Sequence, residues 1–131
     1  MTLEALRGEN LLAGPAATET ELMQDLLRHD GSVRLERIVS PPGFSSPRGL
    51  WYDQAWDEWV LVLRGSARLG LDGAEPVALA QGDHVLIPAG TKHRVEWTDP
   101  GADTVWLALH LLQAHPGPGP GAGLAGSLRS M

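Results

Sequence analysis

The sequence predicts an all-β protein built as one antiparallel barrel, and two observations carry this prediction. From Leu50 to Leu112, short apolar runs are separated by turn residues about every 8 to 10 residues, which is typical of antiparallel sandwiches and barrels. No helix-sized stretch lies between these runs, which argues against a parallel sheet. A chain of 131 residues with 43% hydrophobic content is long enough for one such domain.

Residues 1–31 are expected to precede the barrel and to contain one short helix. Thr18 and Glu21 have the spacing of a capping box, and four apolar residues follow at helical spacing: Leu22, Met23, Leu26 and Leu27. We expect this helix to end at Asp30-Gly31. Alternating residues from Val33 to Val39 then predict a strand with one more polar face, which ends at Pro41-Pro42-Gly43.

Residues 32–112 are expected to form the barrel. Its strands are separated by turn residues at Arg64-Gly65, Asp72-Gly73, Gln81-Gly82-Asp83, Pro88-Ala89-Gly90 and Asp99-Pro100-Gly101. The strand pair from Glu58 to Leu71 is apolar on both faces, which predicts a homodimer because one barrel interior covers only one face. Residues 113–131 are rich in glycine and proline, and we expect a disordered tail there because they bury too little apolar surface to offset chain entropy.

The composition excludes several classes of function. The net charge is −6 and the ten basic residues are scattered, so neither nucleic acid nor an anionic membrane surface is an expected partner. The chain has no cysteine, so a metal would need histidine and carboxylate ligands. The start of the chain lacks the pattern of a signal peptide, and no run of about 18 apolar residues occurs, so we expect a cytoplasmic protein.

The segment from Gly82 to His93 resembles the second sequence motif of the cupin superfamily. That motif is a glycine, five residues, Pro-x-Gly, two residues and a histidine, and Gly82, Pro88, Gly90 and His93 occupy its fixed positions. The resemblance implies a cupin-type antiparallel β-barrel, which is also called a jelly roll or double-stranded β-helix. In such a barrel His93 would face the interior.

The first cupin motif is present only in part. Glu58 and Gly65 have the required separation of six residues. The two histidine positions before Glu58 fall on Trp51 and Asp53 or, with one residue fewer in the spacing, on Tyr52 and Gln54. Cupins include dioxygenases, isomerases, lyases, storage proteins and sensor domains, so the resemblance selects a fold and no single activity.

We expect the barrel to bind one divalent metal, Mn, Fe, Ni or Zn, because carboxylates and imidazoles form a ligand set suited to these ions. The expected metal ligands are His93 and Glu58, with Asp53 or His110. Each has another interpretation: His93 could bond to Glu58 without a metal, Asp53 could cap a turn, and His110 could bond to a backbone carbonyl. Alternation alone does not decide whether His110 faces the interior.

The aromatic residues give a second hypothesis for the interior. Trp51, Tyr52 and Trp97 could line a pocket for a flat or apolar ligand, or they could fill a core or a subunit interface. Two functions follow. One is a metal-binding cupin that acts on or senses a small molecule, and the other is a metal-free cupin that serves as a ligand-binding or structural module. The sequence leaves open whether the protein is an enzyme.

Overall fold

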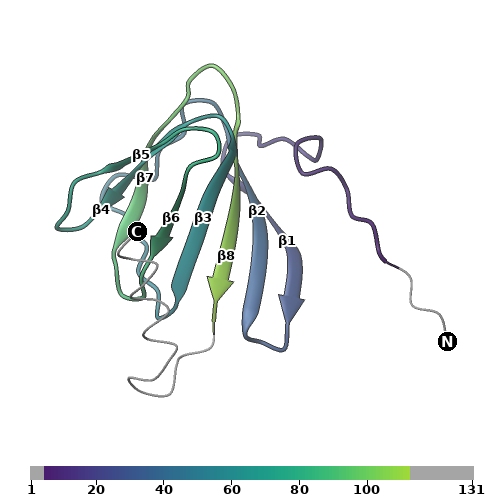
Figure 1. The fold of residues 1–131 in the computed structure, drawn as a ribbon. Coiled ribbons are helices and arrows are strands. Elements are labelled where there is room, and N and C mark those ends of the chain that lie inside the picture. Colours follow the sequence, from purple (N-terminus) through teal and green to yellow (C-terminus); the bar gives the residue numbers. More distant parts are fainter. Residues whose placement is uncertain (1–4, 113–131) are drawn as a thin grey trace.

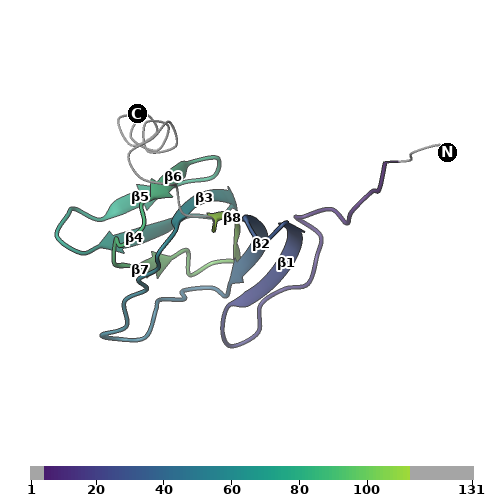
Figure 2. The same cartoon turned by 90° about the horizontal axis from the view of Figure 1, so that it is seen from below.

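The computed structural model describes residues 5–112, which form two antiparallel sheets packed against each other (Figures 1 and 2). The larger sheet has the strand order β1-β2-β8-β3-β6, and the smaller one has the order β5-β4-β7. The strands are β1 (Leu22–His29), β2 (Val33–Ser40), β3 (Asp57–Arg64), β4 (Ala67–Leu71), β5 (Val77–Leu79), β6 (His84–Ile87), β7 (His93–Thr98) and β8 (Thr104–Leu111). The all-β antiparallel prediction is therefore confirmed. The tail predicted for residues 113–131 lies outside the described residues.

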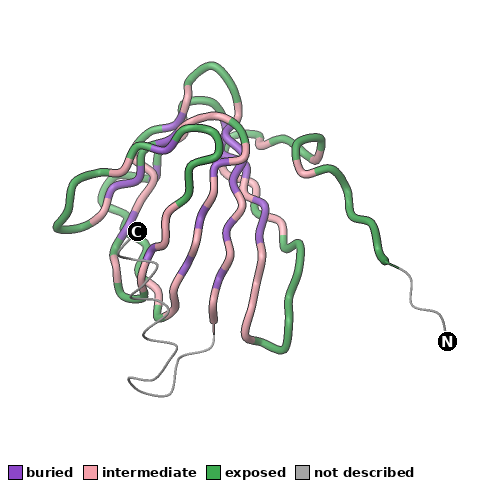
Figure 3. Tube along the Cα trace, viewed as in Figure 1, coloured by how far each residue is buried: buried purple, intermediate pink, exposed green. Residues whose placement is uncertain are grey.

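The hydrophobic core lies between the two sheets, where the buried segments of the tube face one another (Figure 3). Val60 and Val62 from β3, Leu69 from β4 and Trp106 from β8 are among its members. Buried and less buried positions alternate along β3, as expected for a strand with only one face on the core. Each fully buried valine or leucine contributes about 1.5 to 3 kcal/mol, so this shared core holds the sheets together.

The short helix predicted after Thr18 is wrong, because these residues form strand β1. Asp30 and Gly31 have positive φ angles of 47° and 66°, which is the backbone of a tight hairpin turn, and this turn pairs β1 with β2. The register of β1 shifts between Asp25 and Leu27, which marks a β-bulge. The extra residue interrupts the strict alternation of the strand, so the apolar residues recur at a spacing that resembles a helix.

Two other predictions about local structure are confirmed. The alternating segment from Val33 onward is strand β2. The turn after β3 contains Gly65, whose φ is +96° and where an added Cβ would lie 2.7 Å from Oγ1 of Thr104. Only glycine fits such a position. Within residues 5–112 the structure has no helix that is long and apolar enough to cross a membrane.

Candidate functional site

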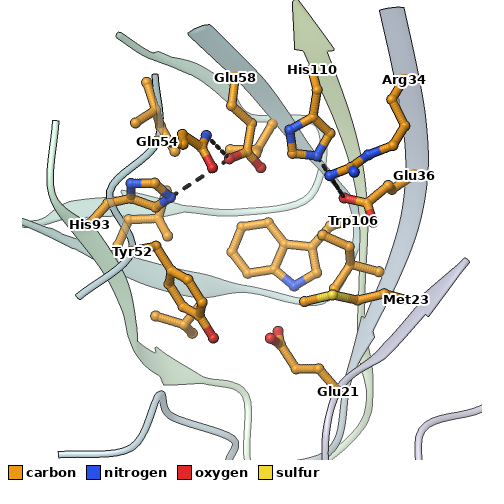
Figure 4. Close-up of a pocket in the computed structure, with 15 residues that line it drawn as sticks. Glu21, Met23, Arg34, Glu36, Tyr52, Gln54, Glu58, His93, Trp106 and His110 are labelled. Atoms are coloured by element: carbon orange, nitrogen blue, oxygen red, sulfur yellow. Dashed lines mark hydrogen bonds and ion pairs between the residues drawn. The ribbon is translucent and has the colours of Figure 1, made fainter. Parts of the chain in front are cut away.

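A cavity of about 250 Å³ lies between the two sheets, and several polar side chains face it (Figure 4). Its size is slightly below the range of about 300 to 1,000 Å³ typical of ligand pockets, so it suits a small molecule. Both sheets and the segments before β1 and β3 contribute to its wall. The lining residues are Glu21, Met23, Arg34, Glu36, Ile38, Tyr52, Gln54, Glu58, Val60, Leu69, Ile87, His93, Val95, Trp106 and His110.

One row of the larger sheet brings three ionisable side chains together. His110 on β8 is paired in register with Arg34 on β2 and with Glu58 on β3. Paired residues of neighbouring strands point to the same face of a sheet, and all three line the cavity. The orientation that alternation left open is therefore resolved, because the face of β8 that carries His110 and Trp106 turns inward.

Glu58 and His93 form a buried pair at the wall of the cavity. The side chain of each is only 9% exposed, and Oε1 of Glu58 lies 3.7 Å from Nε2 of His93. The same oxygen accepts a hydrogen bond of 2.6 Å from Nε2 of Gln54. On the other side of the ring, Nδ1 of His93 lies 2.9 Å from the carbonyl oxygen of Thr91. Because both ring nitrogens face oxygen acceptors, the arrangement favours the doubly protonated imidazolium form of His93.

The electrostatics of the pair agree with this geometry. Burial raises the pKa of Glu58, but hydrogen bonding with His93 and Gln54 outweighs it, so the pKa of Glu58 is lowered overall. Burial lowers the pKa of His93, but hydrogen bonding with Glu58 and Thr91 reverses the effect, so the pKa of His93 is raised. Each partner stabilises the charged form of the other, and the pair can exchange a proton with a bound molecule.

The second histidine of the cavity is held differently. The indole nitrogen of Trp56 donates to Nδ1 of His110 over 2.9 Å, and Nε2 of His110 lies 2.6 Å from Oε1 of Glu36. An indole N–H can only donate, so Nδ1 must accept and the proton of the ring is on Nε2. Both nitrogens of His110 therefore have partners, and the ring holds Glu36 in place.

Glu21 lies at another side of the cavity, close to Tyr52 (Figure 4). The buried hydroxyl of Ser40 donates to Oε2 of Glu21 over 2.6 Å and accepts from the indole nitrogen of Trp106 over 3.0 Å. Burial raises the pKa of Glu21 despite the hydrogen bond from Ser40, and the charges of Glu36 and Glu58 raise it further. Burial and the charge of Glu21 also raise the pKa of Tyr52.

The shorter of the two spacings considered for the first motif matches the structure. Tyr52 pairs with His93 through two backbone hydrogen bonds of 2.8 and 2.9 Å, and Tyr52 and Gln54 both line the cavity. Asp53 and Trp51, the residues of the longer spacing, are exposed and are not among the lining residues. Trp97, which was expected to share the pocket, is 41% exposed and also lies outside the lining.

The residues present do not fit the expected divalent metal. Among the residues that the structure describes, no three histidine, aspartate or glutamate side chains are arranged to hold a metal ion. His93 and Glu58 lie together, but Asp53 is exposed outside the cavity, and both nitrogens of His110 are engaged by Trp56 and Glu36. The ligand set expected from the sequence is thus not assembled in this geometry.

Several residues of the site were not selected from the sequence. Glu36 and Arg34 lie on the more polar face of β2, and that alternation was the available signal. Gln54 was indicated by the motif spacing alone. Glu21 was interpreted as part of a helix cap, so no signal pointed to the cavity.

Comparisons with known proteins agree with the fold. Residues 37–110 match the family model described as "Cupin domain". A solved structure from Ralstonia eutropha, a proposed mannose-6-phosphate isomerase, is 43% identical with a TM-score of 0.76 and covers 82% of this chain and 100% of its own. A cupin superfamily protein from Desulfitobacterium hafniense is 20% identical with a TM-score of 0.67 and covers 86% and 100%. A DMSP lyase from Ruegeria pomeroyi is 19% identical with a TM-score of 0.62, and the match covers 82% of this chain and 57% of the lyase. No curated protein matches the sequence.

Proposed function

Because the chain belongs to the cupin domain family, we propose that its barrel binds a small organic molecule and that the Glu58–His93 pair exchanges a proton with it. The reaction class is isomerisation of a small carbonyl compound. The observation that carries this proposal is the buried pair itself, which lies at the wall of a cavity of about 250 Å³.

The free oxygen of Glu58 is the proton acceptor in this proposal. Oε1 of Glu58 is occupied by Gln54 and faces His93, whereas Oε2 has no hydrogen bond within the described part of the chain. When the carbonyl group of a substrate moves to the next carbon, one carbon loses a proton and its neighbour gains one. Glu58 takes the proton from one carbon and returns it to the other, while the hydroxyl proton of the substrate passes to the former carbonyl oxygen. His93 supplies the adjacent positive charge that stabilises the anionic intermediate.

The comparisons support the reaction class but not one substrate. The relative from Ralstonia eutropha carries the name of an isomerase, and conversion between an aldose and a ketose is a proton transfer between neighbouring carbons. Its 43% identity and full coverage make that chemistry a reasonable expectation for this chain. Whether the substrate of this chain also carries a phosphate group, as the name of that relative implies for its own substrate, depends on the charge of the cavity.

The expected metal remains a separate prediction, and no step of the proposed reaction uses it. What favours a metal is that Glu58 and His93 occupy two motif positions of the family and lie 3.7 Å apart. What speaks against it is the missing third ligand among the described residues. The alternative is a metal-free binding module without catalysis. It would use the same cavity as the proposed isomerase, but Glu58 and His93 would not transfer a proton.

Hydrogen exchange tests the proposed reaction. The full chain is incubated in deuterium oxide with D-mannose 6-phosphate, D-mannose or D-mannosamine, and ¹H NMR follows the loss of the hydrogen on C2. We expect catalysed exchange with at least one of these sugars. General acid–base catalysis contributes a factor of about 100 or more, so Glu58→Gln and His93→Gln should slow the exchange by about a hundredfold.

His84→Ala is the matched control, because His84 is exposed and hydrogen-bonded to Trp59 away from the cavity. It should leave the exchange unchanged. Exchange that is no faster than in buffer for all three sugars would contradict the isomerase proposal. Exchange that is unaffected by both cavity variants would show that other residues catalyse it.

A further inference from the structure

We propose that Arg34 is the anion-binding residue of this cavity, and that the ligand carries a carboxylate or phosphate group that binds to its guanidinium. This inference rests on the proposed function in one respect, namely that the cavity is the ligand site. It goes further by naming a class of substrate, a small carbonyl compound with an anionic oxygen group at another carbon.

Arg34 has a buried donor without an acceptor. Its Nε is buried and has no hydrogen-bond partner among residues 5–112. A guanidinium can only donate, and a buried N–H that lacks an acceptor is costly. The side chain lines the cavity and is 25% exposed, so part of it is open to a ligand. An oxygen acceptor supplied by a ligand would therefore complete the bonding of this side chain.

The two carboxylates nearest to Arg34 do not fill this role. Nη2 of Arg34 lies 3.6 Å from Oε1 of Glu36, and Nε lies 3.9 Å from Oδ1 of Asp25. Both distances are too long for a hydrogen bond. Oε1 of Glu36 is bonded instead to Nε2 of His110 over 2.6 Å, and Asp25 accepts from Nε of Arg28 over 2.8 Å. The ion pairs of Arg34 are therefore loose, and an anionic group of a ligand can bind more closely than either carboxylate.

Two other arginines show that this situation is specific to Arg34. Arg37, on the same strand, donates from Nε to the carbonyl of Leu11 over 2.7 Å, so it fixes the segment before β1. Arg94 also has a buried Nε without a partner, but its Nη2 donates to the carbonyl of Ser46 over 2.6 Å. Arg94 is also not among the lining residues. Arg34 is the only arginine or lysine among the described residues that line the cavity.

The carboxylates in the wall of the cavity do not neutralise this positive charge. Each of them already accepts a hydrogen bond from a donor of the protein, and Glu58 also faces the imidazole of His93. The donors are Ser40 for Glu21, His110 for Glu36 and Gln54 for Glu58. Hydrogen bonds to a carboxylate stabilise its charged form. The negative charge of the wall is thus stabilised within the protein, whereas the guanidinium of Arg34 lacks a close acceptor.

The position of Arg34 suits a ligand that also reaches the Glu58–His93 pair. Arg34, His110 and Glu58 form one row across β2, β8 and β3, and His110 lies between the other two (Figure 4). Neighbouring strands are about 4.8 Å apart, so the backbones of Arg34 and Glu58 are about 10 Å apart. A sugar-sized molecule can therefore place its anionic group on Arg34 and its reacting carbon beside Glu58. The planar guanidinium binds two oxygens of one group at once, which would fix the orientation of the ligand.

Binding calorimetry with the full chain at about pH 7 tests the inference. The three compounds are D-glucitol, D-gluconate and D-glucitol 6-phosphate, which share a six-carbon chain and carry no charge, a carboxylate or a phosphate. Hydrogen bonds between charged groups imply a preference of about tenfold to a hundredfold for one or both anions over D-glucitol. Preference for D-gluconate alone would identify a carboxylate ligand, and preference for D-glucitol 6-phosphate alone would identify a phosphate.

Three variants assign the preference to Arg34. Arg34→Gln should abolish the preference for the anions and leave the affinity for D-glucitol unchanged. Arg34→Lys keeps the charge without the planar fork, so it should retain part of the preference, and it tests the assignment even if Arg34→Gln fails to fold. Arg64→Gln removes the same charge at an exposed position outside the lining of the cavity, so it should leave the preference unchanged.

The outcomes separate this inference from the proposed reaction. Equal affinity for the three compounds, or no binding of any of them, would overturn the anion assignment. A preference that persists in Arg34→Gln, or that Arg64→Gln removes equally, would also overturn it. The three compounds have no aldehyde or ketone group and cannot isomerise, so the hydrogen-exchange experiment judges the proton transfer of Glu58 and His93 independently.

Discussion

The pairing of Glu58 with His93 predicts a coupling energy that a double-mutant cycle can measure. At 3.7 Å, two unit charges in a medium with an effective dielectric constant of about 20 attract each other by about 4.5 kcal/mol. That figure is an upper limit, because burying both charges costs solvation energy. We therefore expect Glu58→Gln, His93→Gln and the double variant to give a coupling of about 1 to 3 kcal/mol in the free energy of unfolding.

The pH dependence of this coupling has a definite sign. The pKa of His93 is raised in the folded state, so its contribution is complete below its ordinary value of 6.5 and is lost as the pH rises through the folded value. The pKa of Glu58 is lowered, so its contribution is complete above its ordinary value of 4.5 and is lost as the pH falls through the folded value. The coupling should thus be greatest between these two ordinary values and decline at alkaline pH.

Urea unfolding followed by tryptophan fluorescence, at about pH 5.5 and about pH 9, measures the cycle. The more exposed pair of Arg68 and Glu96, in which Nε and Oε2 are 3.4 Å apart, is the control and should give less than about 1 kcal/mol at both pH values. A coupling for Glu58 and His93 that is no larger than the control at about pH 5.5, or that does not fall at about pH 9, would refute the charged pair.

Four further predictions follow from the structure. Ser40→Ala should destabilise the protein by about 1 to 3 kcal/mol in urea unfolding, because the indole N–H of Trp106 loses its buried acceptor, whereas Ser32→Ala, at a surface turn, should have little effect. Trp56→Phe should destabilise the protein by about 1 to 3 kcal/mol in urea unfolding, because Nδ1 of the buried His110 loses its hydrogen-bond donor. Elemental analysis of protein purified without chelators tests the expected metal: stoichiometric Mn, Fe, Ni or Zn would support it, and no bound metal even after reconstitution would favour the metal-free module. Light scattering should give twice the chain mass of 14.0 kDa if the predicted homodimer forms, and 14.0 kDa would rule it out.

Much of the barrel could be predicted because its turns are local features. Gly65 and Gly82 occupy positions with φ angles of +96° and +89°, which few other residues adopt, so their places in the sequence mark the ends of strands. Strand β1 could not be predicted in this way. Its bulge near Asp25 breaks the period of two, and pairing with β2 outweighs the local preference for a helix. The Asp30-Gly31 turn was the signal that should have indicated a hairpin.

The site was less predictable than the fold, for a different physical reason. Tyr52 and Gln54 precede β3 in a segment that is largely irregular, so alternation within a strand gives no information about their direction. Their place at the cavity depends on the backbone pairing of Tyr52 with His93, which brings together residues far apart in the sequence. Glu21 depends likewise on a hydrogen bond from Ser40, which only the folded hairpin provides.

The two histidine–glutamate pairs of the cavity have opposite roles because their second ring nitrogens meet opposite partners. His110 meets a donor, the indole of Trp56, so its Nδ1 accepts and its Nε2 donates to Glu36. His93 meets an acceptor, the carbonyl of Thr91, so a second proton completes its bonding. One wall therefore positions the carboxylate of Glu36, and the other can gain and lose a proton beside a bound ligand. This difference, set by a single atom next to each ring, is why we propose Glu58 and His93 for the proton transfer.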